Sequence, residues 1–135
     1  MKIGIDCRHL NFEFKEGVNT YAFGLINGFK NINNKIEFVV FVNFGQKKIM
    51  ENYIKNKNIK ILEIGNSIGF VRKIILIIKI ILNSVSLWKY FNNIYYNLSG
   101  INKFIEKNCS ILYTPTTVLN TYNLKIPTVV SMHDI

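Results

Sequence analysis

Two groups of residues in this sequence are of types that bind or transform polar ligands. Gly17 lies just before an amphipathic run, and His133 and Asp134 follow the last apolar run. Free backbone N–H groups at the start of a helix bind anions, and imidazole binds hydroxyl groups or moves protons. Each group lies at the end of an expected strand or the start of an expected helix, where α/β proteins bind their ligands.

Gly17 and its neighbours predict an anion site. Glycine lets a ligand approach the backbone closely, and the N–H groups of the following helical turn favour a phosphate. The same residue type also serves simple turns, so this reading stays open. The patterns GxGxxG and GxxxxGK[ST] are both absent, which argues against a dinucleotide-dependent dehydrogenase and against a P-loop ATPase.

His133 is the candidate for proton transfer. At the carboxyl end of a parallel strand, a neutral imidazole faces the ligand crevice and can bind a sugar hydroxyl or move a proton, although a structural role is the alternative. Metal binding is not expected, because His9 is the only other histidine and the cysteines Cys7 and Cys109 show no ligand spacing. We expect both cysteines to be free thiols. A GxSxG serine motif is absent.

The elements that must position these residues alternate along the chain. Apolar runs predict strands over residues 2–6, 37–42, 60–64, 110–114 and 128–132. Helical spacing predicts about three turns over residues 21–29, capped by Asn19 or Thr20. A short helix over residues 46–55 is expected to turn inward Ile49, Met50, Tyr53 and Ile54. Residues 102–108 are typical of a helix end. This alternation predicts an α/β protein with a Rossmann-like, doubly wound parallel sheet.

Residues 69–96 admit two interpretations. Residues 74–82 are almost wholly apolar, but charged residues interrupt the window, so no stretch of about twenty apolar residues is present to cross a bilayer. The segment is either a core helix or a helix lying on a membrane surface. The residues that would then contact the headgroups are Arg72, Lys73, Lys79 and Trp88.

The formal charge of +9 does not by itself indicate nucleic-acid binding. Of the 17 basic residues only two are arginine, and no basic cluster interleaves with aromatic residues, so we expect no nucleic-acid partner. Lysine, asparagine and isoleucine are all read from A/T-rich codons, which accounts for much of the charge. Asp6 stands where an export signal would need its apolar core. We therefore expect a cytoplasmic protein, peripheral on the membrane if residues 69–96 dock there.

Four pieces of the sequence, in order, resemble the amino-terminal domain of family 4 glycosyltransferases of the GT-B type. In that family the pieces look like IGIDaR, GigrY, hsP and kiPtVvtiHDl. Here they read IGIDCR (3–8), GVNTY (17–21), ILYTP (111–115) and IPTVVSMHDI (126–135). The resemblance spans the chain, although over residues 38–107 it rests on the order of strands and helices alone.

The resemblance implies a retaining hexosyltransferase that moves a sugar from a nucleotide-sugar donor to a glycan or lipid-linked acceptor in cell-surface polysaccharide synthesis. No metal cofactor is implied, and the acceptor is held mainly by this first domain. Gly17 would approach the donor diphosphate, His133 would lie beside the transferred sugar as the catalytic residue, and Asp134 would orient that corner. The further substrate-binding residues implied are Arg8, Val18, Asn19 and Thr114.

The sequence also departs from the family. Asn19 and Thr20 stand where many members have a small residue and then arginine, so a cationic phosphate contact is absent. The second domain, which holds the nucleotide and a two-glutamate motif, is not in these residues, and no helix covers the last strand. We therefore expect a truncated GT-B protein that is inactive alone. The alternative is a stand-alone Rossmann-like or flavodoxin-like module that docks on a membrane or a partner through residues 72–88.

Overall fold

A computed structural model describes residues 1–10, 17–29, 35–54, 58–65, 77–78, 81, 91, 96, 99–116 and 123–131. In these residues five strands form one all-parallel sheet with the order β3-β2-β1-β4-β5. The strands are β1 (Lys2–Asp6), β2 (Glu37–Asn43), β3 (Ile59–Ile64), β4 (Ile111–Thr114) and β5 (Thr128–Val130). The helices with assigned bounds are α1 (Gly17–Gly28), α2 (Lys47–Tyr53) and α5 (Ile101–Asn108). The α/β class and the Rossmann-like, doubly wound sheet predicted from the sequence are confirmed.

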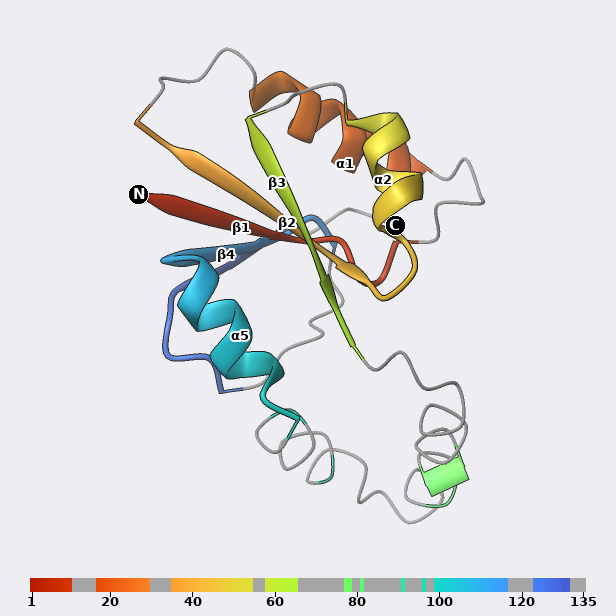
Figure 1. Cartoon of the computed structure of the whole chain (residues 1–135), viewed down its shortest axis with the longest axis vertical. Helices are drawn as coiled ribbons and strands as arrows, with labels where there is room; N and C mark the ends of the chain where they lie inside the picture. The colour runs from red at the N-terminus through yellow and green to blue at the C-terminus, as the bar shows by residue number, and fades with distance from the viewer. Residues whose placement is uncertain are drawn as a thin grey trace.

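The sheet is covered on both faces, with α1 and α2 on one face and α5 on the other (Figure 1). The strand β2, which lies between β3 and β1, supplies side chains to both cores because successive residues of a strand point to opposite faces. Phe38, Val40 and Val42 pack in the core under α1 and α2, whereas Val39 and Phe41 pack under α5. A strand buried on both faces must be apolar throughout, which explains the nearly unbroken apolar run that predicted it.

α1 begins earlier than the sequence pattern predicts. The expectation that Asn19 or Thr20 caps this helix is wrong, because both residues lie inside α1, which starts at Gly17. Asn19 is only 3% exposed, and Val18 packs against the core. Burial of this first turn outweighs the preference of asparagine and threonine for a capping position.

The predicted inward face of α2 is half right. Met50 and the following Ile54 are buried, but Ile49 and Tyr53 are 38% and 44% exposed. Tyr53 instead stacks on Phe23 of α1, with ring centroids 4.7 Å apart. A helix of seven residues presents few positions to the sheet, so only one narrow stripe of it reaches the core.

Three further expectations need adjustment. Residues 102–108, which the sequence predicts as the end of a helix, belong to the short helix α5. This helix follows Gly100, whose backbone is in the left-handed conformation (φ 72°). The last strand ends at Val130, earlier than predicted. The sequence also predicts that residues 2–21 and the residues after the last strand meet across neighbouring strand ends, but β4 lies between β1 and β5. Strand alternation does not determine this order, because either neighbour of β1 satisfies a right-handed crossover.

Residues 69–96 fall almost wholly outside the described residues, so both interpretations of that segment stay predictions. Within the part of the chain that the structure describes, no helix has the length and apolar character needed to cross a membrane.

The two cysteines are free and buried on opposite faces of the sheet. Burial raises the pKa of Cys109 to about 11, with a smaller contribution from the charge of Asp6. Burial likewise raises the pKa of Cys7 well above its ordinary value, again with Asp6 acting in the same direction. Since the thiolate is the reactive form, neither cysteine is poised as a nucleophile.

We expect the buried thiols to make the fold sensitive to alkali. Their pKa values are higher in the folded than in the unfolded chain, so the unfolded chain binds fewer protons above about pH 9 and stability falls as pH rises. Each thiol contributes a slope of at most about 1.4 kcal/mol per pH unit. Urea unfolding between about pH 8 and pH 11 measures this. Cys109→Ala should flatten the slope, and an unchanged slope would contradict the assignment.

Candidate functional site

The order of strands reverses beside β1. From β1 the chain builds outward to β2 and β3 on one side, and β4 and β5 lie on the other. In open parallel sheets, ligands bind outside the carboxyl ends of the strands at such a reversal point. The carboxyl ends of β1 and β4 carry Asp6 and Thr114, so the candidate site is built around these two residues and their neighbours.

Arg8 is held by a buried ion pair with Asp6. Its Nε donates to Asp6 Oδ1 at 2.8 Å, and its Nη2 donates to Oδ2 at 2.7 Å. The Arg8 backbone N–H also donates to Oδ1 at 3.2 Å, and its carbonyl accepts a hydrogen bond from Asn43 Nδ2. The Asp6 and Arg8 side chains are 0% and 6% exposed. The structure thus places Arg8 at the reversal point but inside the protein, and contact with substrate stays a prediction.

Two polar side chains, one next in sequence to Arg8 and one at the end of the neighbouring strand β4, have no hydrogen-bond partner among the described residues. Thr114 is fully buried, and its Oγ1 has no hydrogen-bond partner in the described residues. His9 is partly buried, and both of its ring nitrogens are also without a described partner. Burial lowers the pKa of His9, while the charge of Asp6 raises it and that of Arg8 lowers it by smaller amounts. The sequence predicted Thr114 as cleft-lining, whereas His9 was considered only as a metal ligand.

His9 is expected to make the protein less stable in mild acid. Its pKa is below 6.5 in the folded chain and near 6.5 in the unfolded chain, so the unfolded chain binds more protons as pH falls through this range. The contribution of His9 to the free energy of unfolding is therefore fully present above pH 6.5. It is lost as the pH falls towards the pKa of His9 in the folded chain. Urea unfolding at about pH 7.5 and about pH 5.5, one unit either side of the pKa of a free imidazole, measures the effect. The free energy of unfolding should fall less between these two pH values in His9→Gln than in the parent. Equal losses would contradict this role.

A cluster of three hydroxyl groups, here called the hydroxyl cluster, joins α1, β4 and the residue after β5. Tyr21 Oη lies 3.1 Å from Tyr113 Oη and 3.5 Å from Ser131 Oγ, and Tyr113 Oη is hydrogen-bonded to Ser131 Oγ. The bonds from Ser131 and Tyr113 lower the pKa of Tyr21, whereas burial raises the pKa of Tyr113. None of the three was a candidate from sequence, although each lies in a different one of the four resembling pieces.

The residues predicted to approach a diphosphate form the first turn of α1. Gly17 is exposed, Val18 is half-buried and Asn19 is buried. A Cβ added at Gly17 would meet no atom within 4 Å of the described structure, so the protein itself does not require glycine there. His133 and Asp134 lie outside the described residues, and their roles stay predictions.

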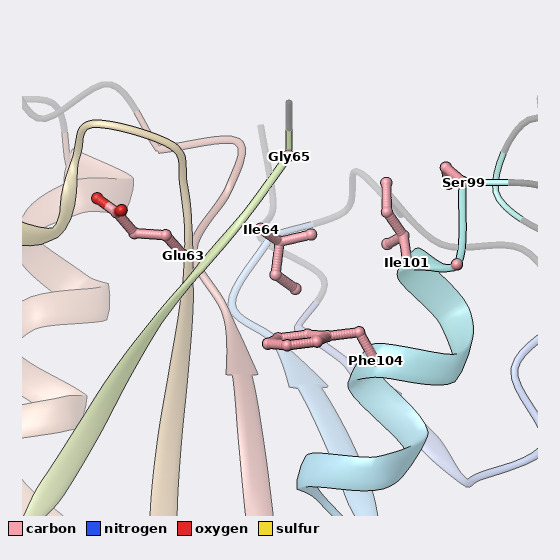
Figure 2. A pocket seen from close by; sticks show the side chains of 7 residues that line it. Glu63, Ile64, Gly65, Ser99, Ile101 and Phe104 are labelled. Atoms are coloured by element: carbon pink, nitrogen blue, oxygen red, sulfur yellow. The ribbon is translucent and has the colours of Figure 1, made fainter. Parts of the chain in front are cut away.

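A cavity of about 270 Å³ lies away from the reversal point, between the end of β3 and the start of α5 (Figure 2). It is lined by Glu63, Ile64, Gly65, Ser99, Gly100, Ile101 and Phe104. In Figure 2 the Glu63 side chain points away from α5. Its Oε1 accepts hydrogen bonds from the backbone N–H groups of Gly45 and Lys47, both at 3.0 Å. Glu63, the carboxylate among the described residues of the cavity wall, is therefore engaged in holding the turn between β2 and α2.

In the described ranges, no group of three or more histidine, cysteine, aspartate or glutamate side chains is arranged to hold a metal ion. Comparison of the chain with protein-family models, with curated proteins and with solved structures gave no match.

Proposed function

We propose that this chain is the amino-terminal, acceptor-side domain of a retaining glycosyltransferase of the GT-B type. The observation that carries the proposal is the convergence of the four resembling pieces. The first piece forms β1 and continues to Arg8, and the second forms the first turn of α1. The third piece forms β4, and the fourth forms β5 and continues to Ser131. β1 pairs with β4, and the hydroxyl cluster joins α1, β4 and Ser131. Pieces up to 110 residues apart thus meet at the end of the sheet where parallel α/β proteins bind ligands.

The proposed reaction transfers a sugar from a nucleotide-sugar co-substrate to a glycan or lipid-linked acceptor, without a metal. The exposed first turn of α1, beginning at Gly17, supplies backbone N–H groups and the positive end of the helix dipole towards the donor diphosphate. His133 acts beside the transferred sugar. The nucleotide is held by a second domain outside this sequence, and the protein works in the cytoplasm, with peripheral membrane contact through the basic residues of the 72–88 segment.

The experiment that tests the proposal begins with the DNA that follows the Ile135 codon in the source genome. A continuing frame with a second series of strands and helices and two glutamates spaced by seven residues is expected. The longer chain, expressed and incubated with labelled nucleotide-sugars and a panel of glycan and lipid-linked acceptors, should transfer sugar, and His133→Ala should abolish the transfer. A stop codon followed by unrelated sequence contradicts the proposal.

The 135-residue chain alone is expected to show no turnover. It lacks the domain that would hold the nucleotide, so the donor cannot be oriented for attack, and such orientation supplies a large part of the catalytic effect. The same donor and acceptor panel measures this, with the longer chain as the positive control. Any sugar transfer by the 135-residue chain would refute the assignment to an acceptor-side domain.

A further inference from the structure

The hydroxyl cluster gathers three hydroxyl groups from distant parts of the sequence at one place on the protein. Its three oxygens come from α1, β4 and the residue after β5, and they lie within 3.5 Å of one another in each pair. Tyr21 is 41% exposed, and Tyr113 and Ser131 are half-buried, so the cluster opens to solvent on its Tyr21 side. It lies beside the reversal point of the sheet, since Tyr113 pairs with Ile5 of β1 and Ser131 N–H donates to the carbonyl of Thr114.

The hydrogen-bonding capacity of the cluster selects the ligand. Each hydroxyl has one proton to donate and two lone pairs, so three mutual contacts use at most three of six acceptor positions. The protons rotate freely, so the cluster can turn a donor outward by giving up one internal bond. A phosphate needs several donors at once, and every donor that the cluster turns outward costs it one internal bond. A cation favours a negative group, which neutral tyrosine and serine side chains do not supply. A sugar hydroxyl, which both donates and accepts, matches both capacities.

The exposed ring of Tyr21 adds a second contact. Tyrosine presents an apolar ring face next to its polar oxygen, and such a side chain suits a ligand with one apolar and one polar side. A pyranose has C–H groups on its ring faces and hydroxyl groups at its edge. The same residue can therefore pack against the ring and bond to the edge.

We propose that the hydroxyl cluster of Tyr21, Tyr113 and Ser131 binds a pyranose through its hydroxyl groups. The inference rests on the proposed function in making this sugar the acceptor. The competing role is purely structural, because the same bonds tie α1 to the residue after β5. The two roles differ in what a lost hydroxyl changes: sugar affinity in the first, thermal stability alone in the second.

The experiment measures binding of three probes to the 135-residue chain by saturation-transfer NMR: methyl α-D-glucopyranoside, methyl α-D-mannopyranoside and methyl β-D-galactopyranoside. Tyr21→Phe and Ser131→Ala should each weaken binding of at least one glycoside roughly 2- to 10-fold, the effect of one lost hydrogen bond. Tyr53→Phe is the matched control, because Tyr53 is 44% exposed and lies on α2, outside the cluster. It should leave the affinity unchanged. Inorganic phosphate should not compete with the glycoside.

The backbone amide chemical shifts of Val130 and Ser131 give a readout that needs no variant. They are expected to change when the glycoside is added to the parent chain. The proposal is overturned if no glycoside binds, if those amides do not respond, or if Tyr21→Phe and Ser131→Ala bind like Tyr53→Phe while their melting temperatures fall. Failure of the proposed function is distinguishable. In that case the glycoside still binds at the cluster while the longer chain transfers no sugar.

Discussion

Replacing Arg8 with methionine is expected to lower the free energy of unfolding by about 3–5 kcal/mol, the usual cost of removing one partner from a buried ion pair. The variant leaves the Asp6 carboxylate fully buried and without its two bonds to the guanidinium, at 2.8 and 2.7 Å. An unpaired charge in such a site is far more costly than a lost surface contact. Urea unfolding monitored by circular dichroism measures the change.

A double variant distinguishes the effect of the two charges from the effect of packing the aliphatic parts of the two side chains. Asp6→Leu combined with Arg8→Met removes both charges, so it should cost less than the sum of the single variants, and it can approach the stability of the parent. The exposed pair of Lys2 and Glu37 is the matched control. These side chains are 53% and 68% exposed and their charged atoms lie 3.2 Å apart. Lys2→Met should cost less than about 1 kcal/mol. An equal cost for Arg8→Met would contradict the argument.

The buried ion pair also bears on how the site is positioned. Asp6 is the last residue of β1, and Arg8 accepts a bond at its carbonyl from Asn43 at the end of β2. The chain that leaves β1 is therefore tied to two strand ends before it continues towards α1. Asp6 thus fixes the position of the Arg8 guanidinium at the end of β1.

The strands were predictable because burial on both faces leaves a strong signal in the sequence. The run from Phe38 to Val42 must be apolar to fill two cores, and no helical spacing explains it. The α2 face was less predictable, because Ile49 is apolar yet exposed in a helix too short to bury both sides. Hydrophobic character alone does not say which side of a short helix meets the sheet.

The candidate site was predictable only in part. Asp6 and Arg8 are near in sequence and follow a clear strand, so their place at the end of β1 could be inferred. The pairing of Tyr21 with Tyr113 joins residues 92 positions apart and depends on β4 lying next to β1. Strand alternation leaves that neighbour undetermined, so the hydroxyl cluster could be found only once the sheet order was known.

Gly4→Ala is expected to cost about 1–3 kcal/mol, since overpacking a filled core displaces its neighbours. An added Cβ would lie 2.6 Å from Cys109 Sγ and 2.7 Å from Phe41 Cε2. Both partners are buried under α5, and Cys109 Sγ is also held by the carbonyl of Ile105 at 3.4 Å. The close approach of β1 to the end of α5 therefore requires a residue without a side chain.

Cys109→Ala tests the reason for that cost. It removes the nearer of the two obstructing atoms, so Gly4→Ala should be less costly in its presence, and the two changes should be non-additive. Gly24→Ala is the matched control, because Gly24 lies inside α1 with no atom within 4 Å of an added Cβ. Alanine there should stabilise the chain by up to about 1 kcal/mol, because it is the better helix former. Strict additivity of Gly4→Ala and Cys109→Ala would show that the strain lies elsewhere, with Phe41 Cε2 at 2.7 Å and the Cβ of residue 109 at 3.1 Å as the remaining contacts.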